Sequence, residues 1–185
     1  MNAVIETTGA KPGTALSLPE AKKEQEATQY LTFMLAGEVF AIGILRIKEI
    51  IEYHNITEVP MMPESVRGVI NLRGSVVPVM DLQARFGRPS SAVTKRTCIV
   101  IVEVASEDER LVVGVIVDAV NEVLDIGAAE IEPAPSFGAR IRTDFIYGMG
   151  KVKGNFVILL DVDRVWASAD IQALAEVVQT DLPVA

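Results

Sequence analysis

Short runs of branched apolar residues, separated by glycine and polar residues, recur along most of the chain. Residues 69–72 and 76–80 flank the connection Arg73-Gly74-Ser75, which predicts a β-hairpin. The same pattern predicts two more hairpins, made of residues 30–35 with 39–42 and of residues 97–104 with 111–117. A further tight turn is predicted at Lys153-Gly154-Asn155. These patterns favour an all-β protein.

The two ends of the chain differ from this pattern. Residues 161–178 carry apolar residues at roughly helical spacing, which predicts a C-terminal helix. Residues 1–27 contain glycine, proline and a charged run but few large apolar residues, which predicts a disordered tail. Residues 179–185 are expected to form a second, short tail.

The chain contains an internal repeat. A shift of 80 positions superposes glycines and aspartates, placing Gly68 on Gly148, Gly74 on Gly154, and Asp81 on Asp161. A shift of 73 positions superposes residues 40–51 on residues 113–124. Because the two shifts differ by 7 residues, the second copy must hold 7 extra residues between Asp125 and Phe145. Two apolar patterns can match by chance, but matched Gly, Asp and Glu residues favour a true repeat.

Each half of the repeat carries one acidic and one basic residue at equivalent positions. Glu49 superposes on Glu122, and Arg73 at its hairpin tip superposes on Lys153. We predict an ion pair in each half. Exposed ion pairs in general contribute only about 0–1 kcal/mol, so its expected purpose is to hold the hairpin tip or present it to a partner. The planar guanidinium of arginine suits this purpose better than the ammonium of lysine does. The alternative interpretation of Arg73 is a solvated turn residue.

Charge and cysteine content exclude several classes of protein. The 185 residues include 17 basic and 25 acidic ones, a net charge of -8, which disfavours nucleic acid and anionic membrane surfaces as partners. The single cysteine, Cys98, cannot form a disulfide within the chain, which favours a reducing cytoplasm. Neither a targeting segment nor a run of about 18 apolar residues occurs, so neither secretion nor membrane insertion is expected.

Candidates for catalysis or metal binding are weak. His54 is the only histidine and lies in a polar stretch, where a surface position is the simplest interpretation. Four aspartates are expected to cap turns and helices at strand ends: Asp81, Asp118, Asp125 and Asp161. The Gly148-Met149-Gly150-Lys151 stretch lacks the spacing of a phosphate-binding loop. We therefore predict no catalytic, cofactor-binding or metal-binding residues and no enzymatic activity.

Two halves of short antiparallel strands suggest two small β-barrels. The motifs then resemble the CheW family of chemotaxis coupling proteins: Tyr30-Leu31-Thr32-Phe33, Ile44-Leu45-Arg46-Ile47-Lys48-Glu49-Ile50, Val69-Ile70-Asn71-Leu72-Arg73-Gly74 with residues 77–82, and residues 112–118. The resemblance covers about residues 28–178. It implies two five-stranded barrels of the Src-homology type, packed side by side around a shared hydrophobic centre. We expect one barrel to comprise about residues 40–90 with 154–178, and the other about residues 96–152 with the N-terminal strands.

The resemblance also implies a function. It implies a cytoplasmic adaptor that couples the regulatory domain of the histidine kinase CheA to the cytoplasmic tips of methyl-accepting chemoreceptors and supports array assembly. Residues expected near the receptor, in a groove between the barrels, are Ile44, Ile47, Ile50, Val115 and Val117. Those expected at a kinase and receptor interface are Glu49, Gly68 and Arg73, with Phe137 at a second kinase interface. Plain core positions for the groove residues, and a barrel plug for Phe137, are the alternatives.

Other functions make different predictions. An enzyme requires a pocket with perturbed titratable groups, and a nucleic-acid-binding barrel requires a basic face with aromatic residues. The acidic charge and the lack of catalytic partners favour a protein-binding module. Among such modules, the alternatives are a scaffold fragment of the CheV type, a regulatory domain of the kinase itself, or a binding module of a related signalling pathway. We expect the chain to have room for neither a receiver domain nor a kinase.

Overall fold

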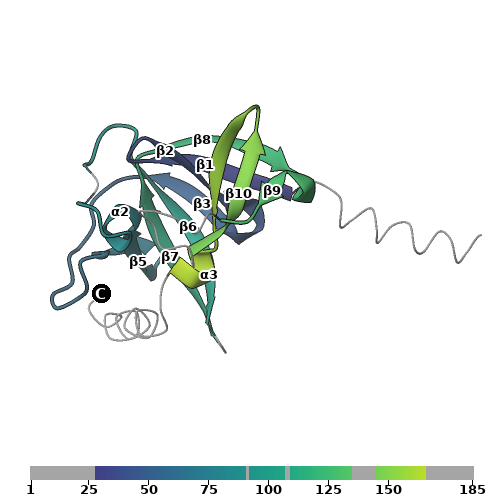
Figure 1. Ribbon diagram of the computed structural model, residues 1–185. Coiled ribbons are helices and arrows are strands. Elements are labelled where there is room, and N and C mark those ends of the chain that lie inside the picture. Colours follow the sequence, from purple (N-terminus) through teal and green to yellow (C-terminus); the bar gives the residue numbers. More distant parts are fainter. Residues whose placement is uncertain (1–27, 91, 107–108, 135–144, 166–185) are drawn as a thin grey trace, which may run out of the picture.

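The computed structural model describes residues 28–90, 92–106, 109–134 and 145–165, which form two β-sheets (Figure 1). Sheet A has six strands in the order β8 (Ala119–Ile126), β1 (Thr28–Leu35), β2 (Glu38–Gly43), β11 (Asn155–Leu160), β10 (Ile146–Val152) and β9 (Ile131–Glu132). Sheet B has five strands in the order β3 (Ile47–Glu52), β6 (Cys98–Ser106), β7 (Glu109–Val117), β5 (Ser75–Asp81) and β4 (Val66–Leu72). The predicted all-β class is confirmed.

Helices are short in the described part of the chain. They are η1 (Ile44–Arg46), α2 (Leu82–Arg85), η2 (Ala128–Glu130) and α3 (Val162–Val165). None of the helices in the described ranges is long and apolar enough to cross a membrane. The predicted C-terminal helix is described only as far as α3; the remainder of it, both predicted tails and Phe137 lie outside the described residues.

The predicted hairpins are present, and three of them share one turn geometry. In each, a two-residue loop has positive φ at both positions: 51° and 83° at Ala36-Gly37, 53° and 87° at Arg73-Gly74, and 51° and 83° at Lys153-Gly154. This is the type I′ turn, whose twist matches that of antiparallel strands. Ser75, expected in the connection, pairs with Leu72 as the first residue of β5. The tip of the β6–β7 hairpin lies outside the described residues.

Strand pairing confirms the repeat and shows that the two copies exchange strands. β3 follows β2 along the chain but pairs with β6, whereas β8 follows β7 but pairs with β1. In each sheet one strand also pairs in parallel with a strand of the other copy: β2 with β11, and β5 with β7. Matching irregularities in register occur in β4 before Gly68 and in β10 before Gly148. Each sheet is therefore built from both copies of the repeat.

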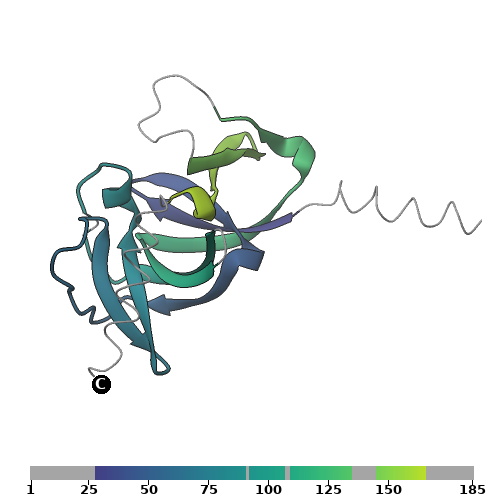
Figure 2. The same cartoon turned by 90° about the horizontal axis from the view of Figure 1, so that it is seen from below.

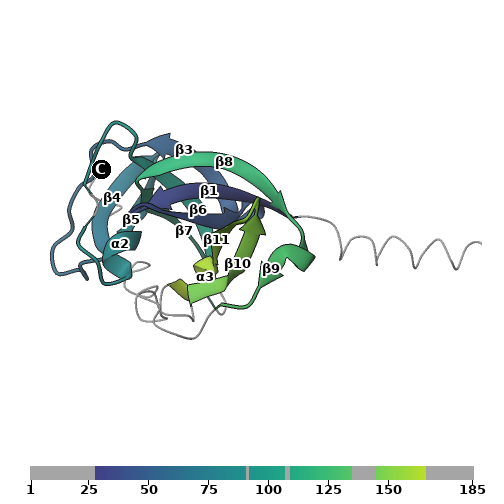
Figure 3. The same ribbon diagram turned by 45° about the horizontal axis from the view of Figure 1, so that its top comes forward.

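This exchange corrects the predicted division of the chain. The prediction grouped residues 96–152 with the N-terminal strands and separated β10 from β11. Instead, β6 and β7 belong to sheet B, and β10 and β11 form one hairpin in sheet A. Figure 3 shows β4 and β5 at one end of the molecule and β9 and β10 at the other. The closure of either sheet into a barrel and the boundaries at 28 and 178 stay predictions.

The largest core cluster lies between the sheets and confirms the shared hydrophobic centre. It includes Phe33 and Phe40 from sheet A and Val102 and Val115 from sheet B, all buried. A smaller cluster is confined to sheet B and another mainly to sheet A. The strands of both sheets are strongly curved (Figure 2). Because successive residues of a strand face opposite ways, strands such as β7 contact two clusters and are buried on both faces.

Candidate functional site

The predicted ion pair of the first half forms at the tip of the β4–β5 hairpin. Arg73 Nη1 donates to Glu49 Oε2 at 2.5 Å, and Nη2 donates to Oε1 at 2.9 Å, so the contact is bidentate. Arg73 has the left-handed φ of 53° that the turn requires. The Gly74 N–H donates to Asn71 Oδ1 at 2.9 Å, which helps to hold the tip. Arg73 is therefore an ion-pairing residue and not only a solvated turn residue.

The pair keeps both groups charged. The hydrogen bond from Arg73 lowers the pKa of Glu49, and the same bond together with the carboxylate charge raises the pKa of Arg73. Glu49 lies between Ile47 and Ile51 on the half-buried side of β3, next to an irregularity in the β3–β6 register. A stable carboxylate and a stable guanidinium suit the binding of charged groups, and neither serves as a general acid or base near neutral pH.

The ion pair lies on the wall of an open depression of about 470 Å³. Its apolar lining residues are Leu45, Ile47, Leu72, Ile101 and Val112. Its charged lining residues are Lys48, Glu49, Arg73 and Glu103. We refer to this set of residues as the Leu45 depression. Aliphatic groups surrounded by charges of both signs are a composition that protein-binding surfaces share.

Leu45 is the most exposed apolar residue of the depression, and the sequence reasoning did not assign it to a site. It lies on η1 and its side chain is 90% exposed. The sequence did contain a signal for an exposed apolar side chain here. Ile44 and Leu45 are consecutive apolar residues between β2 and β3, and both cannot face one core. Exposed leucines are common singly, but this one lies beside a second apolar wall and an ion pair.

The five residues predicted near the receptor occupy different environments. Ile47 lines the Leu45 depression, and Ile44 and Ile47 are half-buried against the shared core. Ile50 is 42% exposed on the edge strand β3. Val115 and Val117 are fully buried in the shared core, so in this conformation they can support a binding surface but cannot contact a partner.

The backbone geometry explains why a glycine occupies position 68. Its φ is +150°, and an added Cβ would lie 2.2 Å from the Thr57 carbonyl oxygen. Thr57 and Val69 exchange backbone hydrogen bonds of 2.8 and 2.9 Å across this contact. The residue therefore permits the β3–β4 segment to approach β4, and it does not line the Leu45 depression.

The prediction of an ion pair in the second half of the repeat is wrong. Glu122 and Lys153 both belong to the described residues, and no ion pair joins them there. The ammonium of lysine is compact and strongly hydrated and lacks the planar fork that lets Arg73 hold Glu49 with two bonds. The equivalence of the two copies thus extends to backbone and turns but not to this side-chain contact.

Three of the four aspartates expected to cap turns or helices accept backbone hydrogen bonds, whereas Asp125 is exposed within β8. His54 is exposed, as expected for a surface residue. Asp81 Oδ1 accepts from the N–H groups of Gln83 and Ala84 and caps α2, and Asp161 Oδ1 accepts from Asp163 N. Asp118 Oδ2 accepts from Ala36 N at 2.8 Å. Within the described ranges, no group of three or more histidine, cysteine or acidic side chains is arranged to hold a metal ion.

The other groups whose pKa is shifted lie away from the Leu45 depression. Burial raises the pKa of Tyr30, with a smaller contribution from Tyr147. Burial also raises the pKa of the Cys98 thiol, with a smaller contribution from Glu52. None of these four residues lines the Leu45 depression.

Comparison with known proteins agrees with the geometry. A family model described as a CheW-like domain matches residues 29–170. The chain is 36% identical to chemotaxis protein CheW of Bacillus subtilis over 136 residues, covering 73% of this chain and 84% of that protein. It is 30% identical to chemotaxis protein CheW of Klebsiella aerogenes over 157 residues, covering 85% and 92%.

A solved structure shows the same fold. The crystal structure of scaffolding protein TtCheW from Thermoanaerobacter tengcongensis matches with a TM-score of 0.70 and 33% sequence identity, over 78% of this chain and 90% of that one. The names of these relatives support the role of a chemotaxis adaptor. With a family-model match over residues 29–170 and a solved relative of similar overall fold, the chain belongs to the CheW-like domain family.

Proposed function

We propose that this protein is a non-catalytic adaptor that couples methyl-accepting chemoreceptors to the histidine kinase CheA and supports kinase activation and array assembly. It binds the cytoplasmic tip of the receptor and the regulatory domain of the kinase, and it is cytoplasmic, held at receptor arrays through these partners. The observation that carries the proposal is the Leu45 depression, where an exposed leucine lies beside the bidentate Glu49–Arg73 pair in a CheW-like chain.

The receptor occupies the apolar part of this surface. An amphipathic helix can place aliphatic side chains between Leu45, Ile47 and Val112, which is the common way for a groove to bind a helix. Ile44, Val115 and Val117 support the surface from the shared core. Ile50, on the adjacent edge strand, extends the exposed apolar area.

The kinase binds the neighbouring β4–β5 hairpin. Arg73 projects from the tip of β4–β5 with its side chain 73% exposed, so the pair with Glu49 shapes a surface that a second protein can reach. Gly68 holds the same hairpin against residues 56–57. Phe137, outside the described residues, is proposed to contact a second kinase copy, which would make the contacts heterologous and able to build rings.

The proposal is tested with Leu45→Asp. We expect affinity for a receptor cytoplasmic fragment to fall by about 30-fold or more, because a central anchor typically contributes about 2 kcal/mol or more to binding. Thermal stability should change little, because the side chain is already in solvent. Isothermal titration calorimetry measures the affinity, and circular dichroism measures the unfolding.

The matched control is Phe156→Asp, which places the same charge at another exposed apolar residue, on β11 of sheet A. This variant should bind the receptor fragment as the unmodified protein does. Equal affinity in both variants, or a wild-type protein that binds neither receptor fragment nor kinase regulatory domain, would sink the proposed function.

A further inference from the structure

A second open depression, of about 940 Å³, shares no lining residue with the Leu45 depression. Its walls come from the end of β1, the β1–β2 turn, α2, the segment before β6 and the crossover between β7 and β8. Its apolar lining includes Met34, Ala92 and Ala119, and its polar lining includes Gln83, Lys95 and Arg96. We refer to this set of residues as the Arg96 depression.

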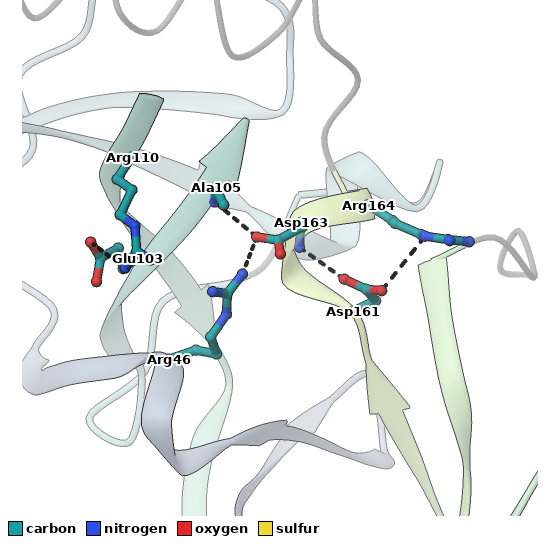
Figure 4. Close-up of polar contacts among 7 residues, drawn as sticks. All are labelled: Arg46, Glu103, Ala105, Arg110, Asp161, Asp163 and Arg164. Atoms are coloured by element: carbon teal, nitrogen blue, oxygen red, sulfur yellow. Dashed lines mark hydrogen bonds and ion pairs between the residues drawn. The ribbon is translucent and has the colours of Figure 1, made fainter. Parts of the chain in front are cut away.

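Arg96 differs from the other arginines of the described ranges because its side chain has no acceptor. Six of those others pair with a carboxylate: Arg46, Arg67, Arg73, Arg88, Arg110 and Arg164. Figure 4 shows three of these pairs, those of Arg46, Arg110 and Arg164. The remaining one, Arg85, donates from Nε to the Val165 carbonyl oxygen at 2.5 Å. The exposed guanidinium of Arg96 therefore keeps its donors available for a partner.

Lys95 and Arg96 lie at the tip of an ordered turn. The Thr97 N–H donates to the Thr94 carbonyl oxygen at 3.2 Å, and the Thr97 hydroxyl accepts from the Thr94 N–H at 2.8 Å. Thr97 is buried, and its carbonyl oxygen accepts from Tyr53 N at 3.2 Å, which ties the turn to the end of β3. Because the turn is already fixed, less conformational entropy is lost when its two cations bind a partner.

Of the described lining residues, only Asp118 is acidic, and its carboxylate is already bonded. Its Oδ2 accepts from Ala36 N at 2.8 Å, and Gln83 Nε2 lies 3.1 and 3.2 Å from its two oxygens. Asp118 pairs with neither Lys95 nor Arg96. The described lining thus carries two positive charges and one negative charge that is engaged elsewhere.

The sequence around the depression has a charge opposite to that of the whole chain. Residues 82–102 contain four basic residues and no acidic residue, whereas the chain as a whole has 17 basic and 25 acidic residues. Two of the four, Arg85 and Arg88, are bonded within the protein, which leaves Lys95 and Arg96. A local positive charge on an acidic protein directs a partner's carboxylates to this place and away from the rest of the surface.

We propose that the Arg96 depression binds an acidic segment of a partner protein. One carboxylate of that segment accepts two hydrogen bonds from the guanidinium of Arg96, and a second carboxylate pairs with Lys95. Aliphatic side chains of the segment cover the apolar lining, which a small inorganic anion would leave in water. This site uses none of the residues assigned to the receptor and the kinase, and its test does not depend on the proposed function.

The first test is a titration of the isotope-labelled full chain with two synthetic peptides of equal length, followed by NMR. One peptide is composed of glutamate and leucine, and the other has glutamine in place of glutamate. We expect the glutamate peptide to shift the amide signals of residues 34–37, 94–97 and 118–119, with an affinity that decreases as salt is added. The glutamine peptide should bind about 10-fold more weakly or less. Absence of binding by the glutamate peptide, or shifts confined to other residues, would overturn the proposal.

The second test uses substitutions at exposed cations, which should leave the thermal melt unchanged. Arg96→Gln should lower the affinity for the glutamate peptide about 10-fold, and Arg96→Lys about 3-fold, because lysine keeps the charge but lacks the planar fork. The matched control is Lys153→Gln, at an exposed lysine of the β10–β11 turn that pairs with no described residue, and it should leave the affinity unchanged. An equal loss in Arg96→Gln and Lys153→Gln would indicate attraction to any basic residue and refute the site.

The third test decides the chemical class of the ligand. Inorganic phosphate and polyphosphate are added to the complex with the glutamate peptide, and sodium chloride of the same ionic strength is the control. We expect all three salts to weaken the complex equally, because screening acts on every exposed charge. Displacement by polyphosphate beyond the sodium chloride effect, and its loss in Arg96→Gln, would assign the depression to phosphate groups and overturn an acidic protein segment as its ligand.

Discussion

Replacing Gly68 by alanine is expected to disrupt the contact between the β3–β4 segment and β4. The new Cβ would lie 2.2 Å from the Thr57 carbonyl oxygen and 2.7 Å from Ile56 Cγ2, and the backbone φ of +150° is one that alanine rarely adopts. Relief of the clash with Thr57 requires movement of the backbone, which weakens its two hydrogen bonds with Val69.

The magnitude follows from two costs. A sparsely populated backbone conformation costs about 1–3 kcal/mol, and overpacking costs about 1–3 kcal/mol more, so the free energy of unfolding should fall by about 2–6 kcal/mol. For a chain of this size, each kcal/mol lowers the melting temperature by about 2–4 °C, so a decrease of about 4–24 °C is expected.

Circular dichroism melts and urea titrations measure the loss, and Gly74→Ala is the matched control. Gly74 also has a positive φ, of +87°, but nothing lies within 4 Å of its added Cβ, so only the left-handed conformation costs about 1–2 kcal/mol. Gly148→Ala, whose Cβ would lie 2.7 Å from Ile131 Cγ2 and 3.0 Å from the Glu132 carbonyl oxygen, lacks the left-handed φ and should be destabilised by overpacking alone. A Gly68→Ala protein as stable as Gly74→Ala would refute this reasoning and return Gly68 to a direct role at a binding interface.

The remaining predictions concern the binding surface, the core beneath it and the dependence on pH. Arg73→Ala and Glu49→Ala should change thermal stability little but act non-additively in a double-mutant cycle of kinase activation; additive effects would count against the pair as a functional unit. Val117→Ala should lower the free energy of unfolding by about 1–3 kcal/mol because it empties part of the shared core, whereas Ile47→Asp should abolish receptor binding in a protein that stays folded; loss of the fold in Ile47→Asp would show that residue to be core. Because Arg73 lowers the pKa of Glu49, the pair's contribution to stability should be fully present above the unfolded value of 4.5 and be lost as pH falls through the lower folded value. Thermal melts from about pH 7 to about pH 2 should show this small loss in the unmodified protein and not in Glu49→Gln.

Much of the local structure follows from the sequence. Alternating branched residues around Ala36-Gly37, Arg73-Gly74 and Lys153-Gly154 predict the hairpins, because strand period and turn conformation depend on residues close together in the chain. The repeat, the family resemblance and the Glu49–Arg73 pair also came from sequence comparison. The same matching of residues failed for Glu122 and Lys153, because a contact between side chains far apart in the sequence depends on the geometry of both side chains.

Tertiary structure alone decided which strands pair and which side chains reach the surface. The apolar pattern of β3 is the same whether the strand pairs with β6 or with a strand next to it in the sequence. The predicted division of the chain was therefore wrong. Val117 and Leu45 are both apolar residues next to a crossover, yet one is in the core and the other in solvent. Their burial, like the contact of Asp163 with Arg46 and Ala105, depends on how distant segments meet in space, and a linear pattern of hydrophobic and polar residues carries no direct record of those distances.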